Sequence, residues 1–585
     1  MDQSQLLARL EGIEWNDFEC KRAQRAVPED AYKTVSAFAN TAGGWLVFGV
    51  SELNGRLEVT GIEEPDKVQR DFLGVLRSGQ KFNRVIRVEP YQYEIDGKRV
   101  FAFYVPEVAR TEKPIYLKGD PRQTYLRRGA GDEQCTQSEL ERFLRDSSAE
   151  RFDSVVLSDI SVDSCFDLET VSWYQDQFAR RNPEHDGTTD HFSFLLNWNF
   201  LVELDGILRP TRAAILLFGT GRFVRQVLPR PVLDYQRIDT AFENWSAEQR
   251  WHDRFVFEEN ILKTWQGLIS RYMRVAEHPF SIDPATLRRN DDPPDYVAFR
   301  EAAINLLIHQ DYGDHGRKAS IKIFSDRVVF WNPGDAFATE AELLDPTEKE
   351  VRNPSIVKAF RRIGLSDQAG TGIRAIFRNW HELGRFPPLL KNDKARKDFE
   401  LILPNSPLIS NSLLERLESL GLNLTSDQIA VVALALSLPA DETLSLTSIR
   451  SLGTTSTREA RELADQLIAN QVLESVGTSH FRLSDQMRVG VTPEVTPEVT
   501  PEVTPEVTPE LARMLSVMTG EMSRAEIMAA LGLRDEKHFR ENYQQYGINE
   551  GLIEMTLPDT PRSSKQRYRL TDLGKALRAS TKGQG

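Results

Sequence analysis

The chain has 585 residues, of which 40% are hydrophobic and 27% are charged, so we expect a soluble protein of about three to five domains. Three widely spaced cysteines argue against a disulfide framework and a zinc site, and no apolar run approaches the length of a membrane span. Because the net charge is -14, any nucleic-acid contact must come from local basic patches; we expect a cytoplasmic protein with no membrane partner.

Residues 1–148 mix predicted helices and strands. The segment GWLVFGV predicts a buried strand, and the alternation on both sides of Asp96-Gly97 predicts a tight hairpin. The stretch EWNDFECKRA is followed by AFANTAGG and by a strand that ends in Gly-Val. These motifs resemble the Schlafen AlbA-type domain, an α/β nucleic-acid-binding domain.

The resemblance implies a possible catalytic site. Nuclease members of the Schlafen family use two glutamates spaced like Glu14 and Glu19, with a later acidic residue, to hold a metal ion for RNA cleavage. Lys21 accompanies them, and Glu52 is the nearest candidate for the third acid, which is an aspartate in the family. Carboxylates around magnesium could activate water against a phosphodiester. The alternative interpretation is an ion pair between Glu19 and Lys21 on one strand face.

Basic residues near the end of this domain are candidates for nucleic-acid contact. Arg127 and Arg128 lie beside Tyr125, a combination that suits phosphate binding with base stacking. A solvated edge strand would have the same sequence.

Residues 155–405 form a second α+β region, which contains a polar stripe. On a helix Glu301, Asn305 and His309 lie along one strip, because residues four apart share a face. The residues between them are all apolar, so the strip needs polar partners. A bound ligand with a metal ion would supply them. The alternative is a structural helix whose polar residues bond to neighbouring loops.

Two glycine turns follow the stripe. WNPGDAF places Asn332 and Gly334 after a predicted strand, and DQAGTGI places Gly370 and Gly372 before a helix, where backbone amides can bind phosphate. In this order the motifs resemble the divergent ATP-binding domain of the gyrase, MutL and histidine-kinase (GHKL) superfamily, an α/β sandwich.

That resemblance assigns roles to the matching residues. It gives Asn305 to magnesium, Glu301 to water activation, and Gly370 and Gly372 to a phosphate lid, with His309 and Gly334 also in the nucleotide site. Asn332 stands where the family has its adenine-binding aspartate. An amide can still accept the adenine amino hydrogen, but more weakly than a carboxylate.

Two C-terminal units, residues 412–485 and 511–579, each read as helices followed by a two-strand wing, and both resemble winged-helix DNA-binding units. Five VTPE repeats over residues 491–510 separate them and predict an extended linker, because proline recurs every fourth residue. Winged helices also dock proteins. The candidate nucleic-acid-binding residues are Arg458, Arg461, Lys537, Arg540, Arg562, Lys565 and Arg567.

The sequence therefore predicts a multidomain α+β protein that resembles bacterial transcriptional regulators often labelled RecG-like helicases. The absence of G-x-x-x-x-G-K-[ST] excludes a P-loop motor. We expect ATP and Mg²⁺ as cofactors, DNA or RNA as partner, and a homo-oligomer by analogy with the ATPase superfamily. The alternative is a nucleotide-gated, magnesium-dependent Schlafen-type ribonuclease in phage defence.

Overall fold

The computed structural model of the chain forms two compact units, residues 1–489 and 490–585, which are described separately. Within the described part of the chain, no helix has the length and apolar character needed to cross a membrane. The structure describes the chain apart from residues 2, 11–15, 54–55, 186–189, 247–250, 275–280, 283–288, 291–292, 346, 367–370, 440–441, 454–455, 477–478, 485–486, 488–513, 516, 519, 534–538, 540–542, 544–552, 557–565 and 572–585.

The first unit begins with a four-stranded sheet in the order β1-β2-β6-β5. Strand β1 is parallel to β2, and the other neighbours are antiparallel. The predicted hairpin at Asp96-Gly97 is confirmed: it joins β5 to β6, and both residues adopt positive φ. The strands and helices of this region are β1 (Phe18–Lys21), β2 (Gly44–Phe48), β3 (Val50–Leu53), β4 (Arg56–Val59), β5 (Glu89–Ile95), β6 (Lys98–Val105), β7 (Tyr125–Arg128), β8 (Gly131–Gln134), α1 (Gln3–Leu10), α2 (Ala31–Asn40), α3 (Pro65–Ser78), α4 (Gln137–Ser147) and the short 3-10 turns η1 (Arg110–Glu112) and η2 (Pro121–Gln123).

The AFAN motif has a structural role in this sheet layer. Asn40 at the end of α2 donates hydrogen bonds to the carbonyl oxygens of Ile115 and Tyr125 and accepts one from the Ile115 amide. Gly44 lies against the ring of Phe38, where a Cβ would come within 2.5 Å. The motif therefore fixes α2 between the sheet and β7.

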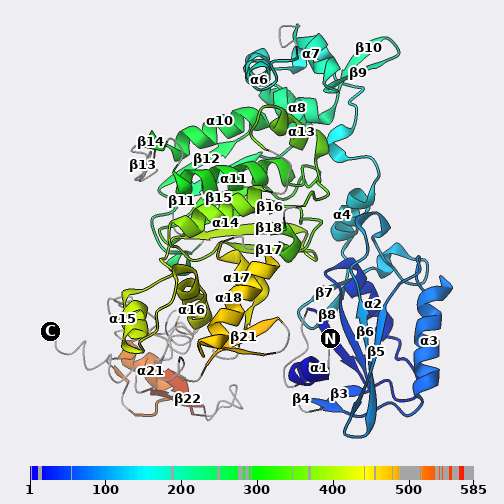
Figure 1. Cartoon of the computed structure of the whole chain (residues 1–585), viewed down its shortest axis with the longest axis vertical. Helices are drawn as coiled ribbons and strands as arrows, with labels where there is room; N and C mark the ends of the chain where they lie inside the picture. The colour runs from blue at the N-terminus through cyan, green and yellow to red at the C-terminus, as the bar shows by residue number, and fades with distance from the viewer. Residues whose placement is uncertain are drawn as a thin grey trace, which may run out of the picture. The chain divides into compact units, whose positions relative to one another are not determined.

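The central region is built on a six-stranded sheet in the order β12-β11-β15-β16-β18-β17, in which β11 and β15 are parallel and the other neighbours antiparallel. Helices α10, α11 and α14 lie over this sheet (Figure 1) and share one apolar core with it. Strands β15 and β16 form a hairpin, which the alternating segment ASIKIFSDRVVFW favours. The elements of the central region are α10 (Ile261–Tyr272), α11 (Pro294–His309), α12 (Glu340–Leu343), α13 (Pro354–Arg362), α14 (Gly372–Glu382), β11 (Leu233–Arg237), β12 (Asp253–Phe257), β13 (Ser281–Ile282), β14 (Arg289–Asn290), β15 (Ser320–Ile323), β16 (Arg327–Pro333), β17 (Leu389–Asp393), β18 (Asp398–Pro404) and η4 (Phe242–Asn244).

A helical segment precedes the central sheet, and a mixed segment follows it. The preceding elements are η3 (Phe152–Ser154), α5 (Val162–Cys165), α6 (Leu168–Arg181), α7 (His191–Asn197), β9 (Leu201–Leu204), β10 (Ile207–Pro210), α8 (Arg212–Phe218) and α9 (Gly221–Val227). The following elements are α15 (Asn411–Ser419), α16 (Ser426–Ser437), β19 (Leu444–Ser445), α17 (Leu446–Ser451), α18 (Thr457–Ala469), β20 (Leu473–Ser475) and β21 (His480–Leu483).

In the second unit the structure describes α21 (Arg524–Leu531), β22 (Ile553–Met555) and β23 (Tyr568–Leu570), with a small apolar core of their own. The VTPE repeats at 491–510 lie outside the described residues. Together the two units are a multidomain mixture of helices and small sheets, as the sequence predicts.

Candidate functional site

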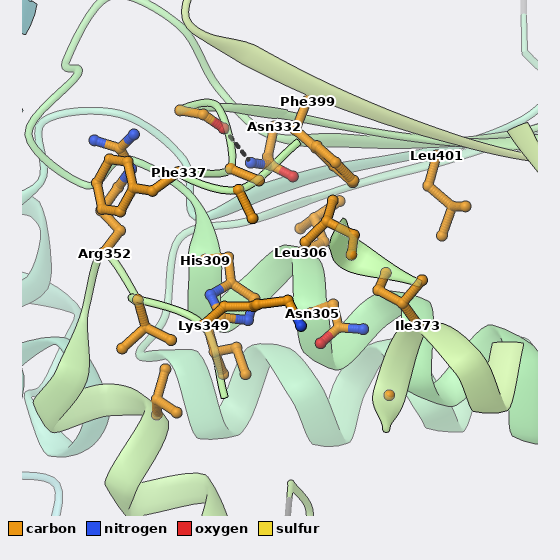
Figure 2. A pocket seen from close by; sticks show the side chains of 18 of the residues that line it. Asn305, Leu306, His309, Asn332, Phe337, Lys349, Arg352, Ile373, Phe399 and Leu401 are labelled. Carbon is orange, nitrogen blue, oxygen red and sulfur yellow. Dashed lines mark hydrogen bonds between the residues drawn. The ribbon is translucent and has the colours of Figure 1, made fainter. Parts of the chain in front are cut away.

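A cavity opens between helix α11, the central sheet and the start of α14 (Figure 2). Together with the solvent space at its open mouth, it measures about 1240 Å³. Its wall consists of Glu301, Ala302, Asn305, Leu306, Ile308, His309, Phe330, Asn332, Gly334, Asp335, Ala336, Phe337, Ala338, Leu343, Lys349, Glu350, Val351, Arg352, Val357, Ser366, Gly372, Ile373, Phe399 and Leu401.

The polar stripe of α11 faces this cavity. Glu301, Asn305 and His309 are partly exposed, whereas residues 302–304 and 306–308 are buried. Helix α11 is apolar around most of its surface because the sheet and other helices enclose it. Figure 2 shows Asn305 and His309 directed from the helix toward the sheet side of the cavity. The stripe therefore marks the line along which the helix meets open space.

Asn305 carries a buried donor without a partner. Its Nδ2 atom makes no hydrogen bond with any described residue, although buried polar groups are nearly always paired because an unpaired one costs about 1–3 kcal/mol. Gly372, the first residue of α14, lies close by: a Cβ there would be 3.3 Å from Asn305 Nδ2 and 3.5 Å from Glu301 Oε2. The start of α14 thus closes over the stripe, and Gly370 lies outside the described residues.

The other two stripe residues differ in charge. Glu301 is ionically paired with Arg300 on the same helix, with 3.3 Å between Oε1 and the guanidinium. Burial, assisted by the charge of Arg352, lowers the pKa of His309 to about 4. His309 is therefore a neutral imidazole at neutral pH and offers a hydrogen bond without a charge.

Asn332 lies on the sheet side of the cavity, across from α11 (Figure 2). It is 4% exposed, and its Nδ2 donates to the carbonyl oxygens of Pro333 and Gly334 at 3.2 Å. Gly334 has a φ of +99°, and a Cβ there would lie 2.8 Å from Arg352 Nε. The turn therefore requires glycine.

Apolar side chains fill the remaining wall between the sheet and the helices. They include Leu306 from α11, Phe330 and Leu401 from the sheet, Phe399 and Ile373. An apolar wall with a few polar groups is the usual composition of a small-molecule site.

A buried ionic cluster, which the sequence did not reveal, lies beside the cavity. Arg352 contacts Asp146 of α4 and lies 3.1 Å from Asp335. Lys397 lies 3.4 Å from each of the same two carboxylates. Burial opposes the charge on Arg352, but the three carboxylates Asp146, Asp311 and Asp335 outweigh it and raise the pKa. The cluster ties helix α4 to the cavity wall.

In the N-terminal domain, Glu19 is buried in a network of cations. It pairs with Lys21, as the structural interpretation of the sequence expected, and its Oε2 lies 2.7 Å from Arg127. Arg127 also contacts Asp132 at 3.0 Å, and Thr34 donates to that carboxylate. The guanidinium of Arg127 thus lies between two carboxylates.

The structure describes one of the other two predicted catalytic acids. Glu14 lies outside the described residues, and Glu52 is exposed on β3. Among the residues that the structure describes, no three His, Cys, Asp or Glu side chains form a group that could hold a metal ion. Of the two predicted acids that the structure describes, Glu19 is buried and paired with Lys21 and Arg127, and Glu52 is exposed.

The basic residues near β7 point in different directions. Arg127 is 3% exposed and Tyr125 is buried, so neither is presented at the surface. Arg128 is partly exposed and pairs with Glu133 and Glu139. Within this pair of arginines, Arg128 is the better placed for phosphate.

The predicted C-terminal nucleic-acid residues are partly described. Arg458 and Arg461 lie on α18, where each pairs with the acid four residues on, Glu462 and Asp465. Arg567 lies 3.5 Å from Glu526. Lys537, Arg540, Arg562 and Lys565 lie outside the described residues.

Comparison with known families identifies parts of the chain. Residues 14–136 match the family described as Schlafen, AlbA_2. The chain carries a Schlafen AlbA_2 domain. Residues 316–403 match "Putative ATP-dependent DNA helicase recG C-terminal", which covers the glycine turns and the central strands but begins after the stripe of α11.

Two further regions match other families. Residues 141–234, which follow the Schlafen AlbA_2 domain, match a domain of unknown function, DUF8451. Residues 509–571 match "Filamentation induced by cAMP protein Fic-like, C-terminal domain", which overlaps the second predicted winged helix. A search of curated proteins gave no match.

Three solved structures resemble the chain. The DIP2311 protein from Corynebacterium diphtheriae is 19% identical over 95% of this chain and 94% of that chain, with a TM-score of 0.37. The N-terminal domain of a putative ATP-dependent DNA helicase RecG-related protein from Nitrosomonas europaea is 32% identical over 23% of this chain and 95% of that chain, with a TM-score of 0.20. A Fic family protein from Desulfovibrio desulfuricans G20 is 14% identical over 69% of this chain and 81% of that chain, with a TM-score of 0.11.

Proposed function

We propose that the chain is an ATP-binding, nucleic-acid-binding regulator, in which nucleotide in the central cavity changes how the protein holds DNA or RNA. The observation that carries the proposal is the unpartnered Nδ2 of Asn305 at the cavity, beneath the start of α14. The Schlafen AlbA_2 and RecG C-terminal matches support a nucleic-acid-associated, ATP-binding role.

The cavity residues fit the proposed ligand. Asn305 would hold Mg²⁺ through its amide oxygen, which leaves the amide nitrogen to donate to phosphate. Asn332 would accept the adenine amino hydrogen, because local carbonyls already occupy its donor. Glu301 would orient or deprotonate a water molecule beside it. When bound, Mg²⁺ neutralises phosphate charge.

The start of α14 is the proposed phosphate lid. Gly372 approaches the stripe without a side chain, and the helix dipole favours an anion at its N-terminus. Gly370 belongs to the same proposed lid. Neutral His309 would donate or accept one hydrogen bond with the ligand.

Nucleic acid would be held by the Schlafen AlbA_2 domain and by the two proposed winged-helix units at 412–485 and 511–579. Within the first of these units, the arginines of α18 are balanced by neighbouring acids, so they would exchange those partners for phosphate on binding. We also propose that the protein is a homo-oligomer and that it is located in the cytoplasm.

The nuclease alternative remains a prediction. Metal binding at Glu19 would require release of Lys21 and Arg127, which already neutralise that carboxylate. No described contact of Glu19 favours cleavage of nucleic acid over its binding. We therefore propose that this domain binds nucleic acid without cleaving it.

Fluorescence anisotropy with random-sequence DNA and RNA tests the proposal. ATP with magnesium should change the affinity of the full chain at least about fivefold, which corresponds to about 1 kcal/mol of coupling. Asn305→Ala should abolish the nucleotide effect and leave binding without nucleotide intact. Asn379→Ala, the same change on α14 outside the cavity wall, is the control. A protein that binds neither nucleic acid, or binds it identically with and without ATP, would refute the proposal.

A further inference from the structure

The charges around the cavity are almost all balanced by an opposite charge. Apart from Lys349, each charged wall residue has a carboxylate or guanidinium against it: Glu301 with Arg300, Glu350 with Arg110 and Arg151, and Asp335 with Arg352. A ligand with several negative charges would therefore find little free positive charge on these side chains.

Lys349 differs because its partners are neutral. Its Nζ atom donates to the carbonyl oxygens of Asp345 and Thr347, at 2.8 and 2.7 Å, and to Thr347 Oγ1 at 2.6 Å. Among the described residues, no carboxylate lies within ion-pair distance of this ammonium group. Glu342, whose carboxylate feels the charge of Lys349, is held by the amide and hydroxyl of Thr339.

The segment that carries Lys349 is fixed on both sides. Asp345 pairs with Arg450 of α17, and Glu350 pairs with Arg110 and Arg151. Figure 2 shows the Lys349 side chain extended along the cavity near Asn305. The ammonium group is thus held at the cavity by a segment that is anchored in two places.

We propose that Lys349 binds the phosphate chain of the nucleotide in this cavity. The oxygens that Lys349 now contacts are neutral, whereas phosphate oxygens carry negative charge and attract the ammonium group more strongly. Phosphate would therefore displace them. Because Thr347 is exposed, water can satisfy the oxygens that are released. The inference rests on the proposed function and adds a residue to it.

Isothermal titration calorimetry of the full chain with adenosine, ADP and ATP, each with magnesium, tests the role of Lys349. Lys349→Met keeps the aliphatic stem and removes the charge. We expect it to weaken ATP at least about tenfold, as for loss of one charge-assisted bond, and adenosine less than about twofold. Lys349→Arg should retain most of the ATP affinity, and Lys349→Gln provides a second neutral variant.

Lys391→Met is the matched control, because Lys391 pairs with Glu400 on the exposed side of β17, outside the cavity wall. It should bind all three ligands as the wild type does. Equal weakening of adenosine and ATP by Lys349→Met, or no weakening of ATP, would overturn the role of Lys349 and leave the nucleotide site standing. Wild-type protein that binds none of the three ligands would overturn the proposed function and this inference together.

Discussion

Arg352→Met tests the buried ionic cluster that joins helix α4 to the cavity wall. Arg352 is 8% exposed and contacts the carboxylates of Asp146 and Asp335, which are also buried. Breaking a buried ion pair by removing one partner costs about 3–5 kcal/mol, because the remaining charge is left uncompensated. Lys397 stays 3.4 Å from both carboxylates. We therefore expect a loss near the lower end, about 3 kcal/mol.

Urea unfolding followed by tryptophan fluorescence measures this loss. Asp146→Asn removes the partner charge, and the double variant should lose at least about 1 kcal/mol less than the sum of the single variants, because contacting residues are coupled. Arg458→Met, which breaks an exposed pair on α18, should leave the unfolding curve nearly unchanged. A loss for Arg352→Met no greater than that for Arg458→Met, or additive losses in the cycle, would show that the cluster does not stabilise the fold.

Two further substitutions probe the cavity. The pKa of His309 is about 4 in the folded chain, below the ordinary 6.5. Between these pH values the unfolded chain therefore binds a proton that the folded chain does not. The free energy of unfolding consequently falls as the pH drops from 6.5 to 4. His309→Gln should reduce that fall by at most about 3 kcal/mol in urea titrations at pH 7 and 4.5; parallel curves for both proteins would contradict the assignment. Gly372→Val places a branched side chain about 3.3 Å from Asn305 and should weaken ATP at least about tenfold in calorimetry. Gly74→Val is the control, because a Cβ at Gly74 meets nothing within 4 Å. If the two variants bind ATP with equal affinity, the start of α14 does not approach the nucleotide closely.

Local patterns predicted the elements and the orientation of the stripe. The hairpins at Asp96-Gly97 and between β15 and β16 follow from alternation and turn chemistry, which depend on neighbours in sequence. Three polar residues four apart interrupt an otherwise apolar helix, and this pattern indicates which side of the helix faces the cavity. Such features need no knowledge of distant contacts.

Contacts between distant residues could not be predicted. Asp146 and Arg352 are far apart in the chain, and neither stands in a periodic pattern that indicates burial. Arg127 appears in sequence as a candidate phosphate ligand, but it turns inward because the buried carboxylate of Glu19 and the half-buried carboxylate of Asp132 need a cation. The neutral partners of Lys349 likewise depend on the path of a loop.

Calorimetric titration of wild-type protein and Asn305→Ala with ATP, each with and without magnesium, tests the nucleotide site most directly. We predict that the wild type binds ATP and that magnesium strengthens this binding. Asn305→Ala should lose most of the magnesium-dependent gain, because the ion bridges this residue to phosphate. If Asn305 has only a structural role, the variant should instead bind ATP with the wild-type magnesium dependence. That result, or wild-type protein that does not bind ATP at millimolar concentration, would contradict the account.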